Sequence, residues 1–320
     1  MNRIGVLTSG GDAPGMNAVI RAVVRFGIEA GMEVYGIYRG FEGLIEGEVY
    51  PLSRRDVGDI LQRGGTILKT ARSERFMTEK GLQQALNVLR TYEIDGLVVI
   101  GGNGSFRGAY SLMQEGIAVM AIPGTIDNDL AFTDRTIGFD TAVNTVLEAI
   151  TRLRDTSSSH DRTTVIEVMG RNCGDIALYS GIAGGAEVVL VPEVKTTMNK
   201  VCRKVLEGIH NGKQHSIIIK AEGYPIDSRE LVKSLEIRTG RDVRLVVLSY
   251  LQRGGSPTLE DRWLASGFAD KAIEFLQTGI YNKAIGFIQG EIVGLDLEEA
   301  LLQTKKFDQR LYESIDILSK

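Results

Sequence analysis

Short apolar stretches alternate with longer stretches of helical periodicity along this chain. In Leu97–Ile100 and Ile217–Ile219 successive residues are all apolar, which is typical of a strand buried on both faces. In Met16–Phe26 apolar residues instead recur every three or four positions, as on one face of a helix. This alternation predicts an α/β fold with mostly parallel strands and right-handed crossovers.

The same patterns predict the individual elements. We expect strands at Ile4–Thr8, Val34–Tyr38, Gly96–Ile100, Val119–Ile122, Thr164–Val168, Glu187–Val191, Ser216–Ala221, Val243–Leu248 and Ala284–Ile288. We expect helices at Met16–Phe26, Thr141–Arg154 and Trp263–Gln277, and a further one from about Phe106. So many strands exceed a usual single sheet, so two α/β domains are expected, although composition marks no boundary.

Two glycine-rich loops directly follow predicted strands and lead into helices. They are Ser9–Gly15 and Gly101–Ser105. Glycine lets backbone amides approach a phosphate, and a helix N-terminus adds partial positive charge. Neither loop has a familiar nucleotide signature, and either alone is compatible with a plain turn. A third glycine set, Gly64–Thr66, follows a helical pattern instead.

A pair of carboxylates follows the buried strand predicted within Ile117–Ile122. Pro123 and Gly124 end that strand, and Asp127 and Asp129 stand in the polar loop beyond it. Ligands bind at the carboxyl ends of such strands. One carboxylate can take a proton from a hydroxyl while its neighbour holds a metal ion. The alternative is a turn in which Asp and Asn cap their own backbone.

Composition narrows the class of protein. The chain has 320 residues, 43% of them hydrophobic, and a net charge of −4, which argues against a nucleic-acid-binding surface. No apolar run approaches the ~20 residues of a membrane span, and glycines begin too early for a signal peptide. The two cysteines, Cys173 and Cys202, suit a reducing compartment and are few for a zinc site. We expect a soluble, cytoplasmic protein.

Arginines are the residues that bind phosphate in a forked geometry. Five of them stand near predicted strand ends: Arg72, Arg162, Arg171, Arg244 and Arg253. A single arginine is usually a solvated surface group, but several at one edge of a sheet favour a phosphorylated ligand.

Five strings together resemble the bacterial ATP-dependent 6-phosphofructokinases over essentially the whole chain. They are LTSGGDAPGMNA (7–18), PGTIDND (123–129), RDTSSSH (154–160), EVMGRNCGD (167–175) and QRGGSP (252–257). The resemblance implies phosphoryl transfer from MgATP to the 1-hydroxyl of fructose 6-phosphate. It also implies two doubly wound, mostly parallel α/β domains with the active site between them. The ATP domain would comprise residues 1–138 and 251–301, and the sugar-phosphate domain residues 139–250 and 302–320.

The resemblance further implies roles for individual residues. Asp127 matches the general base, while Thr125 and Arg171 match groups that steady the transferring phosphoryl. Asn103 and Asp129 match positions near Mg²⁺. The ATP-binding positions are Gly11, Arg72, Ser73, Gly102, Asn103, Gly104 and Ser105. The sugar-phosphate positions are Thr125, Ile126, Asp127, Arg162, Met169, Gly170, Arg171, Glu222, Arg244, Tyr250 and Arg253.

Neighbouring subunits are also implied. Arg162 and Arg244 match arginines that enter the active site from another subunit of a homotetramer. An effector pocket shared between subunits would take ADP as activator or phosphoenolpyruvate as inhibitor. Its positions are Arg21, Arg25, Arg54, Asp59, Arg154, Gly185, Glu187, Lys213 and His215. From their spacing alone, Arg21 and Arg25 would be read as part of a solvated helix face.

The chain also departs from the family pattern. Asn103 stands where relatives have an aspartate that attracts magnesium, so we expect weaker MgATP use and lower turnover. Tyr250 stands where relatives have a histidine that contacts the sugar phosphate, so we expect weaker fructose 6-phosphate binding. The small residues Gly104 and Gly124 favour ATP over pyrophosphate as donor, and Ser73–Phe76 differs locally at the nucleotide edge.

Two alternatives of other kinds remain. One is a weakly active or inactive paralogue that binds sugar phosphate and nucleotide as a sensor, suggested by Asn103. The other is a kinase with a similar glycine loop that acts on NAD or diacylglycerol, which the PGTIDND and QRGGSP strings disfavour.

Overall fold

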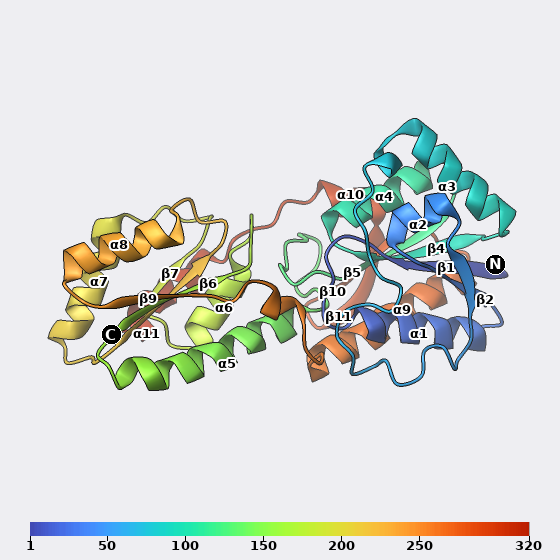
Figure 1. The fold of residues 1–320 in the computed structure, drawn as a ribbon. Helices are drawn as coiled ribbons and strands as arrows, with labels where there is room; N and C mark the ends of the chain where they lie inside the picture. Colours follow the sequence, from blue (N-terminus) through green and yellow to red (C-terminus); the bar gives the residue numbers. More distant parts are fainter. Residues whose placement is uncertain (320) are drawn as a thin grey trace. The chain divides into compact units, whose positions relative to one another are not determined.

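The protein folds into two compact α/β units, seen in a computed structural model that describes residues 1–319 (Figure 1). Unit 1 comprises Met1–Thr141 and Arg253–Lys305. Unit 2 comprises Ala142–Gln252 and the C-terminal segment from Lys306. The chain therefore passes from one unit to the other three times. The α/β fold class predicted from the sequence is confirmed.

Unit 1 is built on a seven-stranded sheet with the order β11-β10-β5-β4-β1-β2-β3. The five inner strands run parallel, while β3 and β11 pair antiparallel at the two edges. The strands are β1 (Arg3–Thr8), β2 (Glu33–Ile37), β3 (Val49–Leu52), β4 (Gly96–Gly101), β5 (Ala118–Pro123), β10 (Lys283–Ile288) and β11 (Glu291–Asp296).

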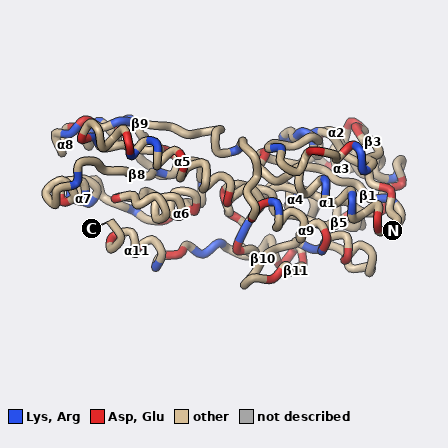
Figure 2. Tube along the Cα trace, turned by 90° about the horizontal axis from the view of Figure 1, so that it is seen from below, with Lys and Arg blue, Asp and Glu red and all other residues tan. Residues whose placement is uncertain are grey.

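Helices cover both faces of this sheet (Figure 1). On one face α1 (Met16–Glu29) packs against α9 (Leu259–Gln277). The other face carries α2 (Gly40–Glu46), the short 3-10 helix η1 (Arg75–Met77), α3 (Glu79–Thr91), α4 (Asn103–Gln114) and α10 (Leu297–Leu302). Strands β4 and β5 carry no charged residue, so the Lys, Arg, Asp and Glu residues coloured in Figure 2 lie on other segments of the chain.

The winding of unit 1 reverses between β1 and β4. The chain moves from β1 to β2 and β3 on one side, and then to β4 and β5 on the other. Because β1 and β4 are parallel neighbours, the loops that follow them start side by side, and the Ser9 N–H donates to the Ile100 carbonyl at 2.9 Å. Such a switch point is where open α/β sheets bind ligands.

Unit 2 is built on a four-stranded parallel sheet with the order β7-β8-β6-β9. Its strands are β6 (Thr163–Val168), β7 (Val188–Leu190), β8 (Ser216–Ala221) and β9 (Val243–Val247). Figure 1 shows α7 and α8 over one face and α5 and α6 over the other. Its helices are α5 (Phe139–Ser158), α6 (Asp175–Ala183), α7 (Met198–His210), α8 (Ser228–Thr239), η2 (Ser249–Arg253) and α11 (Gln309–Leu318).

All nine predicted strands are present, but two edge strands escaped prediction. Strand β3 is only four residues long and contains Pro51, and β11 contains Gly294 and is partly exposed. A proline and a glycine are tolerated in an edge strand, because one side of such a strand has no neighbouring strand to pair with. The stretch before Gly64 is a series of turns, so the helical pattern expected there was wrong.

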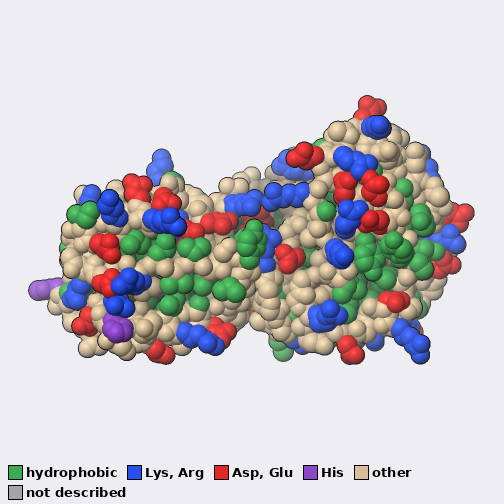
Figure 3. All heavy atoms as spheres, viewed as in Figure 1, with side chains coloured by type: hydrophobic (Ala, Val, Ile, Leu, Met, Phe, Trp, Pro, Cys, Tyr) green, Lys and Arg blue, Asp and Glu red, His purple; other side chains and the backbone are tan. Residues whose placement is uncertain are grey.

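The composition predicts neither a basic, nucleic-acid-binding surface nor a membrane-spanning segment. Positive and negative side chains are interspersed over the face seen in Figure 3. Among residues 1–319 no helix is long and apolar enough to cross a membrane.

A buried carboxylate in unit 1 fixes the start of α5. Asp261 is fully buried and accepts hydrogen bonds from the backbone N–H groups of Gly138 at 2.7 Å and Thr141 at 2.9 Å. The Thr141 hydroxyl also donates to Asp261 and accepts from the Thr258 N–H at 3.0 Å. Asp261 thus satisfies otherwise unpaired donors of the first turn of α5, the helix in which the chain leaves unit 1. Burial raises the pKa of Asp261 to about 6, although its hydrogen bonds oppose the shift.

We predict that Asp261→Asn changes the pH dependence of stability. The folded pKa of Asp261 is raised above its ordinary 3.8, so its contribution to stability is full below that value and is lost as pH rises through about 6. Between pH about 5 and about 7.5 the wild type should lose about 1.4 kcal/mol of unfolding free energy that Asp261→Asn does not lose. Urea denaturation of both proteins at the two pH values measures this difference. Identical pH dependence in the two proteins would contradict it.

Candidate functional site

Three loops meet at the carboxyl edge of the unit 1 sheet. They follow β1 (residues 9–15), β4 (Gly102 and the first turn of α4) and β5 (residues 124–129). The helix expected from about Phe106 begins earlier, at Asn103, so most of the predicted Gly101–Ser105 loop is helical. The Ser9 bond to Ile100 joins the first two, and the Gly124 N–H donates to the Gly101 carbonyl at 3.0 Å. The two glycine loops and the carboxylate loop noted in the sequence therefore form one continuous edge.

The loop after β4 leaves room for a ligand beside a helix N-terminus. Helix α4 begins at Asn103, and a Cβ added at Gly104 would meet nothing within 4 Å. The Ser105 side chain is buried, with 3% of its surface exposed, and its hydroxyl has no hydrogen-bond partner among residues 1–319. The open space beside the first turn of α4 suits the oxygens of a phosphate, because a helix N-terminus carries partial positive charge.

The carboxylate loop is a braced turn. The Thr125 hydroxyl accepts from the Asp127 N–H at 3.2 Å, and Asn128 has a left-handed φ of 51°. The Thr136 hydroxyl donates to the Thr125 carbonyl at 2.7 Å, and Lys305 donates to the Asn128 carbonyl at 2.7 Å. A threonine hydroxyl thus caps this turn, and side chains at both ends hold the backbone that carries Asp127.

Arginines reach the same edge of unit 1. The Arg253 guanidinium lies against Gly11, where an added Cβ would be 1.9 Å from Nη1, and its Nη1 is 3.8 Å from a carboxylate oxygen of Asp12. Arg72 is exposed and lies two residues beyond Thr70, whose hydroxyl donates to the Gly10 carbonyl at 2.8 Å. The candidate residues that belong to unit 1 are Gly11, Arg72, Ser73, Gly102, Asn103, Gly104, Ser105, Thr125, Ile126, Asp127, Asp129 and Arg253.

A second group lies at the carboxyl edge of the unit 2 sheet. The Glu222 N–H donates to the Val168 carbonyl at 2.8 Å, which joins the ends of β8 and β6. Glu222 and Arg171 then form an ion pair with 3.8 Å between Oε1 and Nε. Met169 and Gly170 lie in the same loop as Arg171, and Tyr250 follows β9 in η2 with 77% of its surface exposed.

Two predicted substrate residues lie at the opposite edge of this sheet. Arg162 directly precedes β6, and Arg244 is the second residue of β9. Both pair with Asp242, at 2.6 Å and 3.0 Å. The length of β6 separates Arg162 from Met169 by about 20 Å. A single chain therefore does not bring these arginines together with the other candidate residues of unit 2.

The candidate effector residues of unit 2 form one polar cluster. Arg154 contacts the His215 ring at 3.2 Å and donates to the Gly185 carbonyl at 3.0 Å. Lys213 pairs with the buried Glu187 at 3.2 Å, and Glu187 also accepts from the Ile217 N–H. Burial lowers the pKa of His215, and the Arg154 charge lowers it further.

The remaining effector candidates lie in unit 1. Arg21 and Arg25 are one turn apart on α1. The pKa of Arg21 is lowered mainly by burial and, to a smaller extent, by the positive charge of Arg25. Arg54 pairs with Glu29 at 2.5 Å, and Asp59 lies in the turns after β3 with a left-handed φ of 53°.

Arg107 is a residue of the site that sequence reasoning missed. Its Nε donates to the Asn103 amide oxygen at 3.3 Å, one helical turn away on α4. The i, i+4 spacing was the available signal. The contact gives the first turn of α4 a positive charge beside the open space at Gly104.

No cluster of three or more His, Cys, Asp or Glu side chains that could hold a metal ion occurs among residues 1–319. Magnesium does not require such a cluster, because it is commonly held by one or two protein oxygens together with substrate phosphates. The half-buried Asp129 and the exposed Asn103 offer oxygens of that kind, so the residues present fit magnesium that arrives with a nucleotide.

The family model described as phosphofructokinase matches residues 3–276. The chain belongs to the phosphofructokinase family. It is 56% identical over 319 residues to a Clostridium tetani protein and 55% identical over 320 residues to a Clostridium botulinum protein (strain Loch Maree). Both are named ATP-dependent 6-phosphofructokinase, and each match covers 100% of both chains. The family predicted from the sequence is confirmed.

A solved structure supports the same assignment. The phosphofructokinase of Saccharomyces cerevisiae matches 100% of this chain with 33% identity and a TM-score of 0.88. The match covers 47% of the yeast chain, so this family member spans about half of that protein's length.

We predict that Gly101→Ala destabilises the edge where the loops meet. Its Cβ would lie 2.3 Å from the Ser105 hydroxyl and 2.5 Å from the Ser9 carbonyl, so the loops after β1 and β4 must separate. The unfolding free energy should fall by about 1–3 kcal/mol in urea denaturation. Gly104→Ala is the matched control, since its Cβ meets no atom and its stability should not fall. An equal loss in both variants would rule out this explanation.

Proposed function

We propose that this phosphofructokinase-family member transfers the γ-phosphoryl group of MgATP to the 1-hydroxyl of fructose 6-phosphate, giving fructose 1,6-bisphosphate and ADP in glycolysis. The observation that carries the proposal is the braced Asp127 loop beside the open α4 N-terminus, on one sheet edge. The full-length similarity to two proteins named ATP-dependent 6-phosphofructokinase supports the choice of ATP and sugar phosphate.

The proposal assigns the nucleotide to unit 1. Its phosphates would lie at the α4 N-terminus, where the space around the Gly104 backbone is open. Arg72 and Arg107 would add positive charge at that edge. Because Gly104 has no side chain, the space beside it stays open. A nucleotide needs that space, whereas the smaller pyrophosphate does not, so the open space supports ATP as the donor.

Asp127 is the proposed general base. It takes the proton from the 1-hydroxyl of the sugar as that oxygen attacks the γ-phosphorus. Thr125 and Arg171 would steady the phosphoryl group, with Ile126 beside them in the loop. Magnesium, held by Asp129 and Asn103 with the phosphates, would neutralise charge that develops on the phosphate oxygens. Unit 2 would bind the sugar phosphate through Met169, Gly170, Glu222 and Tyr250, and unit 1 would contribute Arg253.

The distant position of Arg162 and Arg244 supports a role between subunits. Arg162 lies about 20 Å from Met169 along β6, and Arg244 pairs with the same Asp242, so both would serve the active site of a neighbouring copy. We therefore propose a homotetramer in the cytoplasm. The proposed effector pocket for ADP or phosphoenolpyruvate comprises Arg21, Arg25, Arg54, Asp59, Arg154, Gly185, Glu187, Lys213 and His215.

The sensor alternative is not favoured, since both full-length relatives carry the name of the enzyme. A steady-state assay with ATP, magnesium and fructose 6-phosphate tests the proposal directly. NAD and diacylglycerol serve as alternative acceptors in the same assay. If no acceptor gave turnover, the inactive paralogue that binds sugar phosphate and nucleotide as a sensor would be the better explanation.

We predict that Asp127→Asn lowers kcat by about 10²–10⁴-fold, because the amide cannot accept the hydroxyl proton. The KM values and the urea-denaturation midpoint should change little, since Asn has the same shape and the backbone braces of the turn are kept. Unchanged kcat would remove Asp127 from the proposed chemistry.

We predict that Asn103→Asp raises turnover and lowers the magnesium concentration required for half-maximal rate. A carboxylate attracts magnesium where the amide does not. The same variant gains an ion pair with Arg107, so Asn103→Asp combined with Arg107→Met should lower the magnesium requirement further. Rates measured over a magnesium series in all variants check this. An unchanged or reduced rate in Asn103→Asp would refute it.

A further inference from the structure

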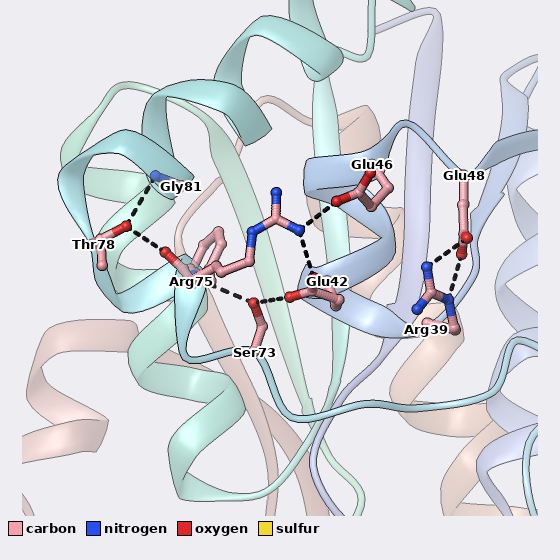
Figure 4. Close-up of polar contacts among 9 residues, drawn as sticks. Arg39, Glu42, Glu46, Glu48, Ser73, Arg75, Thr78 and Gly81 are labelled. Carbon is pink, nitrogen blue, oxygen red and sulfur yellow. Dashed lines mark hydrogen bonds and ion pairs between the residues drawn. The ribbon is translucent and has the colours of Figure 1, made fainter.

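The segment after Arg72 is attached to helix α2 by a compact polar cluster (Figure 4). Arg75, in η1, donates through Nη1 to Glu42 at 2.8 Å and also to Glu46, one helical turn further along α2. The Ser73 hydroxyl donates to the second carboxylate oxygen of Glu42 at 2.5 Å. One carboxylate therefore holds both Ser73 and Arg75.

The same segment is also fixed internally. The Ser73 hydroxyl accepts from the Phe76 N–H at 3.1 Å, and the Thr78 hydroxyl donates to the Arg75 carbonyl at 2.6 Å. A Cβ at Gly81 would lie 2.0 Å from that carbonyl, so the first turn of α3 packs directly on Arg75. Residues 73–76 are thus held against the first turn of α3 and form a rigid segment, which we call the Ser73–Phe76 corner.

Apolar packing connects this corner to the α4 helix. The rings of Phe76 and Phe41 stack with their centroids 4.3 Å apart. A Cβ at Gly108 of α4 would lie 2.6 Å from the Phe41 ring, so α2 and α4 are in close contact. Helix α2 therefore supports both the Ser73–Phe76 corner and the helix whose N-terminus begins at Asn103.

Arg72 lies between two anchors. On one side Thr70 is bonded to the Gly10 carbonyl, and on the other Ser73 is bonded to Glu42. Arg72 itself is exposed, and within residues 1–319 no ion pair joins its side chain to a carboxylate. The residues on both sides of Arg72 are thus held in place, while the Arg72 side chain itself is exposed.

We propose that Glu42 and Arg75 are positioning residues that hold Arg72 at the nucleotide edge, which fixes the approach of the nucleotide phosphates to unit 1. The proposal rests on the proposed function, because it takes the bound anion to be ATP. The ion pairs involve half-exposed side chains, with 50% exposure for Arg75 and 44% for Glu46, so their main effect is on geometry rather than on stability.

The test compares Glu42→Gln and Arg75→Met with Glu48→Gln. Glu48 forms a two-point ion pair with Arg39 at 2.8 and 2.6 Å beside the same helix, but it contacts nothing in the Ser73–Phe76 corner (Figure 4). In Glu42→Gln and Arg75→Met the KM for ATP should rise by roughly fivefold or more, with kcat within about twofold and the KM for fructose 6-phosphate unchanged. Glu48→Gln should leave all three constants unchanged.

Hydrogen exchange gives a reading that needs no ligand. Amides of residues 73–77 should exchange faster in Glu42→Gln and Arg75→Met than in wild type or Glu48→Gln. The double variant should raise the KM for ATP no more than the stronger single variant, since both act through one cluster. An unchanged KM for ATP in both single variants, or an equal rise in Glu48→Gln, would overturn the proposal. Absence of ATP turnover in the wild type would instead overturn the proposed function.

Discussion

The parallel pairing of β1 with β4 is the constraint on which the candidate site depends. Each strand is followed by a glycine loop and a helix, and the winding of the sheet reverses between them. The segments that follow β1 and β4 therefore leave the sheet in different directions, and no backbone fills the space between them. Strand β5 lies next to β4, so the Asp127 loop ends at the same edge. One register between buried strands thus sets the relative position of the two glycine loops and the carboxylate loop.

The central strands could be predicted because their chemistry is local. A strand such as Gly96–Gly101, buried on both faces, must be apolar at successive residues, and that pattern is visible in the sequence alone. Edge strands β3 and β11 lack it, since exposure on one side permits Pro51 and Gly294. The boundaries of the two compact units left no trace in composition, because the three crossings lie in ordinary sequence rather than in linkers.

Contacts between distant segments could not be predicted in the same way. Glu42 and Arg75 are far apart in the sequence and follow no shared periodicity, and tertiary packing such as that of Phe41 on Phe76 brings them together. The buried Asp261 lies in the first turn of α9, yet its carboxylate caps a different helix, α5. Motifs indicated which residue types carry the chemistry, whereas the groups that hold them in place depend on tertiary structure.

The three crossings have a consequence for the order of folding. Strand β10 pairs with β5, but residues 142–252 of unit 2 are synthesised between them. The unit 1 sheet therefore remains without β10 and β11, and α1 without its partner α9, until most of unit 2 has left the ribosome. During synthesis the first 141 residues must wait with an apolar helix face and an open sheet edge exposed. The same arrangement that joins the units at three points thus makes the nascent chain most vulnerable to aggregation before residues 253–305 appear.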